Sequence, residues 1–198
     1  MLAAVRLHVE DVATAAARLG PALAALGLEP EPPAAWGAFA LVPANRGAIT
    51  CGLHVAFIAP SLADVEAFWH AGMGAGLRDD GPPGPRPQYA PDYHAAFLRD
   101  TGGNSFEAVH HADAPRQGVL DHVTVRVADL ASARTSLARI ATATGLSLRE
   151  TSGGTALVAA RPGDALLLLE GPPTLVPEIA FRAPDGSRSE LVLHHGTR

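Results

Sequence analysis

One pattern of apolar and polar positions occurs three times along the chain. Each copy begins with a short, mostly apolar run of the kind that forms a strand. The runs are residues 5–9, 54–58 and 122–127. Asp11, Ser61 or Asp129 follows the run, and then comes an alanine- and leucine-rich stretch with helical spacing. Asp and Ser are good N-caps because their side-chain oxygens accept from the free amides of the first helical turn. The pattern therefore predicts three strand-then-helix units.

A second matched element follows the second and third predicted helices. Residues 93–109 and 178–192 each have the pattern of a strand, a glycine-containing turn and a strand, with Glu107 and Glu190 in equivalent places. Each segment predicts a β-hairpin that closes a βαβββ unit. The first unit is shorter, with only residues 38–42 as a clear strand after its helix. The expected fold is α+β, with repeated βαβββ modules that form a curved, cupped mixed sheet and helices on its outer face.

The turn-forming residues suggest how these units are joined. Gly and Pro clusters mark loops, and residues 113–118 are the one plausible domain boundary. Only the short link at residues 45–53 separates units one and two, so we expect them to form a principal paired-module domain over residues 1–112. Unit three, at residues 118–198, then has an unmatched inner face. It predicts a dimerisation or site-completing unit, and hence a homodimer.

Composition narrows the classes of function. The chain has 198 residues, of which 47% are hydrophobic and 18% charged, which is typical of a folded globular protein. The formal net charge is −5, and all 15 basic residues are arginines without an arginine-rich block, which argues against a nucleic-acid partner. No apolar run approaches the ~20 residues that a membrane-spanning helix needs. We expect a cytoplasmic protein without a membrane partner.

The register of the repeat places donor side chains at matched positions. The residue seven positions before each N-cap is Ala4, His54 or His122. Glu107 stands among apolar neighbours, and a buried carboxylate needs a partner because an unpaired buried charge is costly. A histidine and a glutamate repeated in two units can together hold a divalent cation. The alternative is that these side chains only form ordinary hydrogen bonds.

These residues carry a resemblance to a known family. Residues 54–57, the Gly/Pro-rich loop 81–87 and residues 93–109 resemble the second half of a glyoxalase/bleomycin-resistance/extradiol-dioxygenase domain, of the vicinal oxygen chelate superfamily. The start of unit three resembles the opening strand and helix of that family, and residues 184–190 resemble its closing hairpin. The resemblance implies paired βαβββ modules around a divalent metal that chelates substrate oxygens. It maps His54, Glu107, His122 and Glu190 to the positions of metal ligands.

The sequence departs from the family pattern at one ligand position. Ala4 has no donor atom, and His8 stands four residues further along the strand, ~13 Å away, which is too far to replace it. If units one and two pair, only His54 and Glu107 remain as ligands. If units two and three pair, a four-ligand set becomes complete. Imidazole and carboxylate ligands suit Zn, Fe, Mn or Ni.

Two functions follow from the resemblance. One is a metal-dependent lyase, isomerase or dioxygenase that acts on a small oxygen-rich substrate, with Glu107 as the catalytic group that moves a proton. The other is a metal-free protein of the bleomycin-resistance type, without a cofactor, which sequesters a small molecule. Tyr89, Tyr93 and Arg86 follow the Gly/Pro-rich loop and are candidates for substrate binding at the cavity mouth, or else surface residues. The paired histidines 110–111 and 194–195 are expected to be solvated strand ends.

Overall fold

The three predicted helices form where the N-cap residues place them. The computed structural model describes residues 2–45, 47–112, 118–151, 154–158, 165–183 and 185–191. Within these ranges lie the helices α1 (Val12–Ala25), α2 (Leu62–Gly74) and α3 (Leu130–Thr144). Asp11, Ser61 and Asp129 cap them, and each cap side chain accepts a hydrogen bond from a backbone N–H of the first turn.

The strands form two sheets. In chain order they are β1 (Leu2–Val9), β2 (Ala35–Trp36), β3 (Phe39–Pro43), β4 (His54–Ile58), β5 (Arg78–Pro85), β6 (Tyr93–Arg99), β7 (Ser105–His111), β8 (Leu120–Val127), β9 (Ser147–Thr151), β10 (Gly154–Val158), β11 (Ala165–Glu170), β12 (Glu178–Arg182) and β13 (Arg188–Leu191). The larger sheet has the order β5-β6-β7-β4-β8-β11-β10-β9, and the smaller has the order β13-β12-β1-β3-β2.

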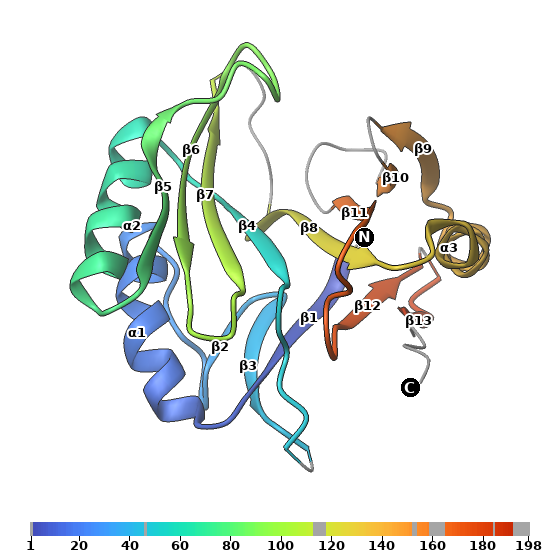
Figure 1. Ribbon diagram of the computed structural model, residues 1–198, viewed down its shortest axis with the longest axis horizontal. Helices are drawn as coiled ribbons and strands as arrows, with labels where there is room; N and C mark the ends of the chain where they lie inside the picture. The colour runs from blue at the N-terminus through green and yellow to red at the C-terminus, as the bar shows by residue number, and fades with distance from the viewer. Residues whose placement is uncertain are drawn as a thin grey trace.

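The larger sheet contains two complete βαβββ units (Figure 1). In unit two, β4 pairs in parallel with β7, and in unit three, β8 pairs in parallel with β11. An antiparallel pairing of β4 with β8 joins the two units into one sheet. The mixed α+β class and the βαβββ modules are therefore confirmed.

The strand pairing corrects the predicted place of one hairpin. The hairpin of β12 and β13 does not close unit three, because β12 pairs antiparallel with β1 in the smaller sheet. Strands β9, β10 and β11 close unit three instead. Units two and three therefore share a sheet, while the strands of unit one lie in the other. Strand β8 of unit three pairs with β4 of unit two within the chain. The dimer and the division at residues 1–112 and 118–198 stay predictions, and the boundary falls mostly outside the described residues.

The smaller sheet is fastened across the chain by side chains as well as by strand pairing. Arg6 of β1 forms an ion pair with Glu178 of β12, its register partner. The Nε2 atom of His8 lies 2.8 Å from the other carboxylate oxygen of Glu178. These contacts tie β12, late in the sequence, to the first strand.

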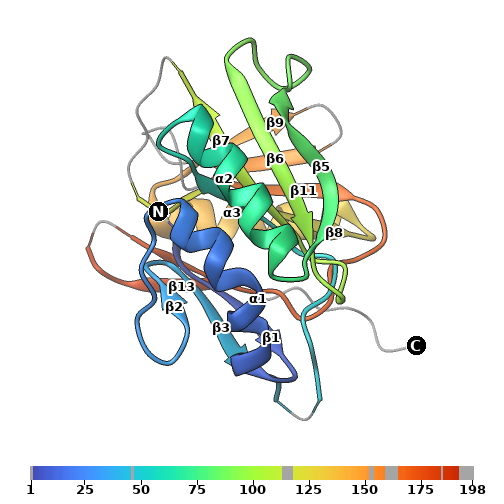
Figure 2. The ribbon, with the colours of Figure 1, turned by 90° about the vertical axis from the view of Figure 1, so that its left-hand side faces the viewer.

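The apolar core lies between the two sheets and under the helices. Phe39 of β3 packs edge-to-face on Phe57 of β4, with ring centroids 5.2 Å apart, and also contacts the ring of Phe106 on β7. Helix α2 packs on β5, β6 and β7 of the larger sheet, and helix α1 lies beside α2 and contacts β3 of the smaller sheet (Figure 2). The side chains on the opposite face of the larger sheet are left free to form a site. No helix among the described residues is long and apolar enough to cross a membrane.

Candidate metal centre

Strand alternation directs His54 away from the core. Val55 and Phe57 of β4 are fully buried in the core between the sheets, whereas His54 is half-buried on the other face. Ala56 stands two residues further on that face and is the register partner of both Glu107 on β7 and His122 on β8. Because Ala56 carries only a methyl group, the two larger side chains on either side of it have room to converge with His54.

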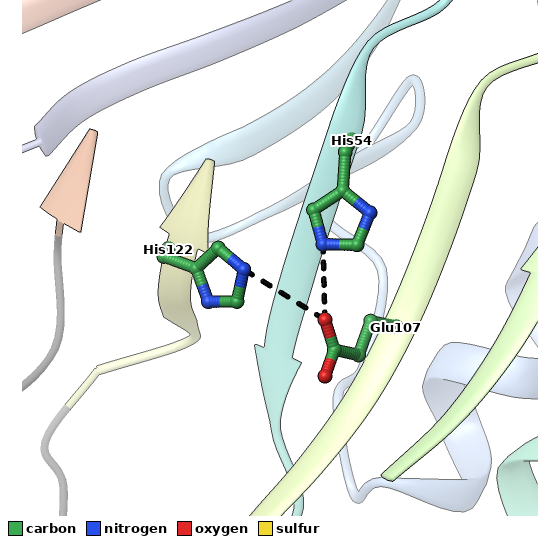
Figure 3. Close-up of side chains that lie close together, drawn as sticks. All are labelled: His54, Glu107 and His122. Carbon is green, nitrogen blue, oxygen red and sulfur yellow. Dashed lines mark hydrogen bonds and ion pairs between the residues drawn. The ribbon is translucent and has the colours of Figure 1, made fainter. Parts of the chain in front are cut away.

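The side chains of His54, Glu107 and His122 meet at one point (Figure 3). Each offers a donor atom, and the three atoms lie within 4.8 Å of one another. The Oε2 atom of Glu107 lies 2.9 Å from Nε2 of His54 and 3.7 Å from Nε2 of His122. The two imidazole rings stack with their centroids 5.2 Å apart. Both histidines thus present the same ring nitrogen to the same carboxylate oxygen.

Glu107 is held by a second contact on its other oxygen. Its side chain is only 2% exposed, and the Tyr93 hydroxyl donates a 2.6 Å hydrogen bond to Oε1. Burial raises the pKa of Tyr93, and the nearby Glu107 charge raises it further, so the phenol stays a protonated donor. A buried carboxylate is costly without a compensating positive charge, which favours a cation next to Oε2.

The donor set fits a divalent metal. Two ligand atoms bound at about 2.1 Å to one cation lie about 3 to 3.4 Å apart in octahedral or tetrahedral geometry. The oxygen-to-nitrogen distances here, 2.9 and 3.7 Å, lie close to that range. Two imidazoles and one carboxylate are ligands that Fe, Mn, Zn and Ni accept.

The fourth predicted ligand, Glu190, is not part of this group. It lies on β13 in the smaller sheet, where it is exposed and stands 3.5 Å from the Arg188 side chain. The predicted role of Glu190 as a ligand depended on its hairpin closing unit three, but this hairpin lies in the smaller sheet. In unit two, Glu107 pairs with Ala56, two residues after His54. In unit three, the residue that pairs with Thr124, two residues after His122, is Leu167. Leu167 therefore occupies the position equivalent to Glu107. Three of the four predicted ligands therefore come together.

The three donors line a large cleft on the free face of the larger sheet. The cleft has a volume of about 1110 Å³. Arg86, Tyr89 and Tyr93 all line it, where the sequence analysis expected a cavity mouth. The Arg86 side chain donates to two backbone carbonyls of its own loop and lies over the Phe97 ring, and Tyr89 packs on Tyr93. The Tyr93 hydroxyl is engaged with Glu107, and the predicted contact of these residues with substrate stays a prediction.

Two residues beside the site were missed in the sequence. The Oδ2 atom of Asp121 lies 2.9 Å from Nδ1 of His122, within hydrogen-bond distance, and Nε2 of His111 lies 3.5 Å from Oδ1 of Asp121. The expectation that His111 is a solvated strand end is wrong, since its side chain is 7% exposed. The pair 194–195 lies outside the described residues. The signal for Asp121 was its place directly before His122, but strand alternation predicts opposite faces for two adjacent residues.

Comparison with known proteins identifies the fold. No protein-family model and no curated protein matches the sequence. Among solved structures, glyoxalase I from Zea mays is similar over 90% of this chain and 72% of its own, with a TM-score of 0.61 and 19% identity. A mutant of that enzyme gives a TM-score of 0.58 with 21% identity over 86% of this chain and 67% of its own. A glyoxalase/bleomycin resistance protein from Albidiferax ferrireducens T118 is 28% identical over 55% of this chain and 98% of its own, with a TM-score of 0.49.

The similarity to glyoxalase I confirms the resemblance at the level of the fold. The chain has the fold of glyoxalase I, and within that fold two histidines and one glutamate form a group that could hold a metal ion.

Proposed function

We propose that the protein is a metal-dependent enzyme of the glyoxalase/dioxygenase type that acts on a small, oxygen-rich molecule. The observation that carries the proposal is the convergence of His54, His122 and Glu107 in a cleft large enough for a substrate. A divalent cation held there would polarise bound carbonyl or enolate oxygens, and its open positions would allow a substrate to chelate it.

The side chains around the three donors suit this function. Tyr93 holds Oε1 of Glu107, so that Oε2 faces the two histidines. Leu167 and Leu169 of β11 give the cleft an apolar wall, which keeps water from that side of the substrate. Arg86 and Arg126 line the same cleft and add positive charge, which favours an anionic or oxygen-rich ligand.

The absence of a carboxylate at Leu167 bears on the reaction class. Glu107 is the one carboxylate in the described donor group, and it is both a ligand and the predicted proton carrier. A lyase or isomerase reaction asks for a carboxylate free to move a proton, whereas two histidines and one carboxylate with open positions are typical of non-haem Fe(II) oxygenases. Among lyase, isomerase and dioxygenase, the donor set therefore favours a dioxygenase.

A metal-free binding protein is the second candidate. The observation in its favour is the 2.9 Å contact between His54 and Glu107, which can be a complete hydrogen bond without a cation. The cleft would then sequester an apolar or aromatic small molecule, with Tyr89 and Phe97 among the residues that line it.

Metal analysis of the purified protein separates the two candidates. We expect bound metal in protein prepared without chelator, and none after His54→Ala. The variant should keep the fold, because the His54 side chain faces the cleft and adds little to core packing. His70→Ala, on the exposed side of α2, is the matched control and should keep the metal. If His54→Ala retains its metal, or the wild type binds none of the four candidate metals, the enzyme proposal falls and the binding-protein proposal replaces it.

A further inference from the structure

A β-bulge places Asp121 on the same side of the sheet as His122. Val55 and Ala56 of β4 pair in register with Val123 and His122, but Phe57 pairs with Leu120. Asp121 is therefore the extra residue of a bulge and has no register partner on β4. A bulge breaks the alternation of side chains, so that two successive residues can point to the same side. This explains how Asp121 and His122, adjacent in the sequence, form a 2.9 Å hydrogen bond.

The carboxylate of Asp121 lies between two imidazoles. Its Oδ2 atom lies 2.9 Å from Nδ1 of His122, and its Oδ1 atom lies 3.5 Å from Nε2 of His111. The side chains of Asp121 and His111 are 6% and 7% exposed. The His111 ring packs edge-on against the Tyr93 ring, with centroids 4.9 Å apart. His111 thus lies beside Asp121 on the side away from His122.

The other histidine of the site has no such support from the residue before it. Leu53 precedes His54 and is fully buried in the apolar core. Strand β4 is regular at His54, and the Leu53 side chain has no acceptor atom. The two histidines, equivalent in the sequence repeat, therefore differ in what lies behind their rings. Burying a carboxylate costs free energy. If residue 121 served only to continue the strand, an apolar side chain there would make the protein more stable than Asp121 does.

We propose that Asp121, supported by His111, is a positioning residue that fixes His122 in the tautomer with its proton on Nδ1 and the Nε2 lone pair directed at the metal site. A ring nitrogen that donates to a carboxylate leaves the other nitrogen as the ligand, and such a partner orients the ring. The part of this proposal that concerns metal rests on the proposed function, whereas the tautomer is a property of the metal-free protein.

The test combines a spectroscopic and a thermodynamic measurement. Long-range ¹H–¹⁵N correlation spectra report the tautomer of each neutral imidazole. The His122→Gln variant identifies the His122 signals. We expect the Nδ1–H tautomer for His122 in the wild type, and a shift toward the Nε2–H tautomer in Asp121→Asn, whose amide can donate to Nδ1. Calorimetric titration with Mn²⁺ should show affinity about 10- to 100-fold weaker for Asp121→Asn.

Glu190→Gln is the matched control, since it makes the same carboxylate-to-amide change in the other sheet and should leave both measurements unchanged. If the wild type binds no Mn²⁺ but the His122 tautomer differs between the wild type and Asp121→Asn, the positioning role is supported and the proposed metal binding is contradicted. If Asp121→Asn keeps both the tautomer and the Mn²⁺ affinity of the wild type, the positioning role is overturned while metal binding stands. If the variant does not fold, the wild-type spectrum decides, because an Nε2–H tautomer for His122 there also overturns the proposal.

Discussion

Removing the hydroxyl of Tyr93 tests whether this residue holds Glu107 or serves only the substrate. Tyr93→Phe removes one oxygen and keeps the ring, which packs against His111 and Tyr89. The lost hydrogen bond is 2.6 Å long and joins two buried groups, Tyr93 at 9% and Glu107 at 1% exposure. A hydrogen bond to a charged group contributes about 1.5 to 3 kcal/mol. We therefore expect the metal-free variant to lose about 1.5 to 3 kcal/mol of unfolding free energy.

Urea denaturation with chelator present measures this difference, provided that the slope of unfolding free energy against urea is the same in both proteins. Tyr89→Phe is the matched control, since Tyr89 lines the same cleft and is 63% exposed. Its loss should stay within about 0.5 kcal/mol. A loss below about 0.5 kcal/mol for Tyr93→Phe would refute the inference that Tyr93 stabilises the buried carboxylate, and would leave a role toward substrate as the better interpretation.

Two further predictions concern the packing of the fold. Burial by itself would raise the pKa of Glu178, but hydrogen bonds from side chains of β1 lower it below its usual value. The charged Glu178 side chain therefore stabilises the folded state above the pKa of the unfolded state, and this stability is lost as the pH falls through the pKa of the folded state. Glu178→Gln should lower the unfolding free energy by up to about 1 kcal/mol at neutral pH and should have no effect in acid. A series of urea midpoints in which the difference between the two proteins grows toward low pH would contradict this. Gly72→Ala would place a methyl group 2.3 Å from Leu98, which should outweigh the gain of about 1 kcal/mol in helix propensity and lower the melting temperature. In the same helix, Gly74→Ala would meet no atom within 4 Å beyond its chain neighbours and the helix's own backbone, so it should raise the melting temperature. Two changes of the same sign would count against the packing argument.

Local signals predicted the units, and non-local pairing decided how they assemble. The N-caps and apolar runs placed all three predicted helices, because caps and periodicity act within a few residues. The alternation of β4 correctly directed His54 away from the core. The hairpin of β12 and β13 has the same local pattern as β6 and β7, but a local pattern does not say which distant strand it joins. Strand β11, an apolar run buried on alternate residues, pairs with β8 instead and has Leu167 at the position equivalent to Glu107.

The two halves of the larger sheet repeat one another in topology, yet they differ at two positions where the chemistry is decided. On β11, Leu167 stands at the position where the repeat would place a glutamate, so the cleft has an apolar wall beside the donors. On β8, the bulge adds a carboxylate behind a histidine. The first change depends on a pairing between distant strands, and the second on one extra residue within a pairing. Neither follows from a register counted along the sequence, although that register placed His54 and His122 correctly. The symmetry of the repeat therefore accounts for where the site lies, and its two departures from symmetry account for the asymmetry of its donors.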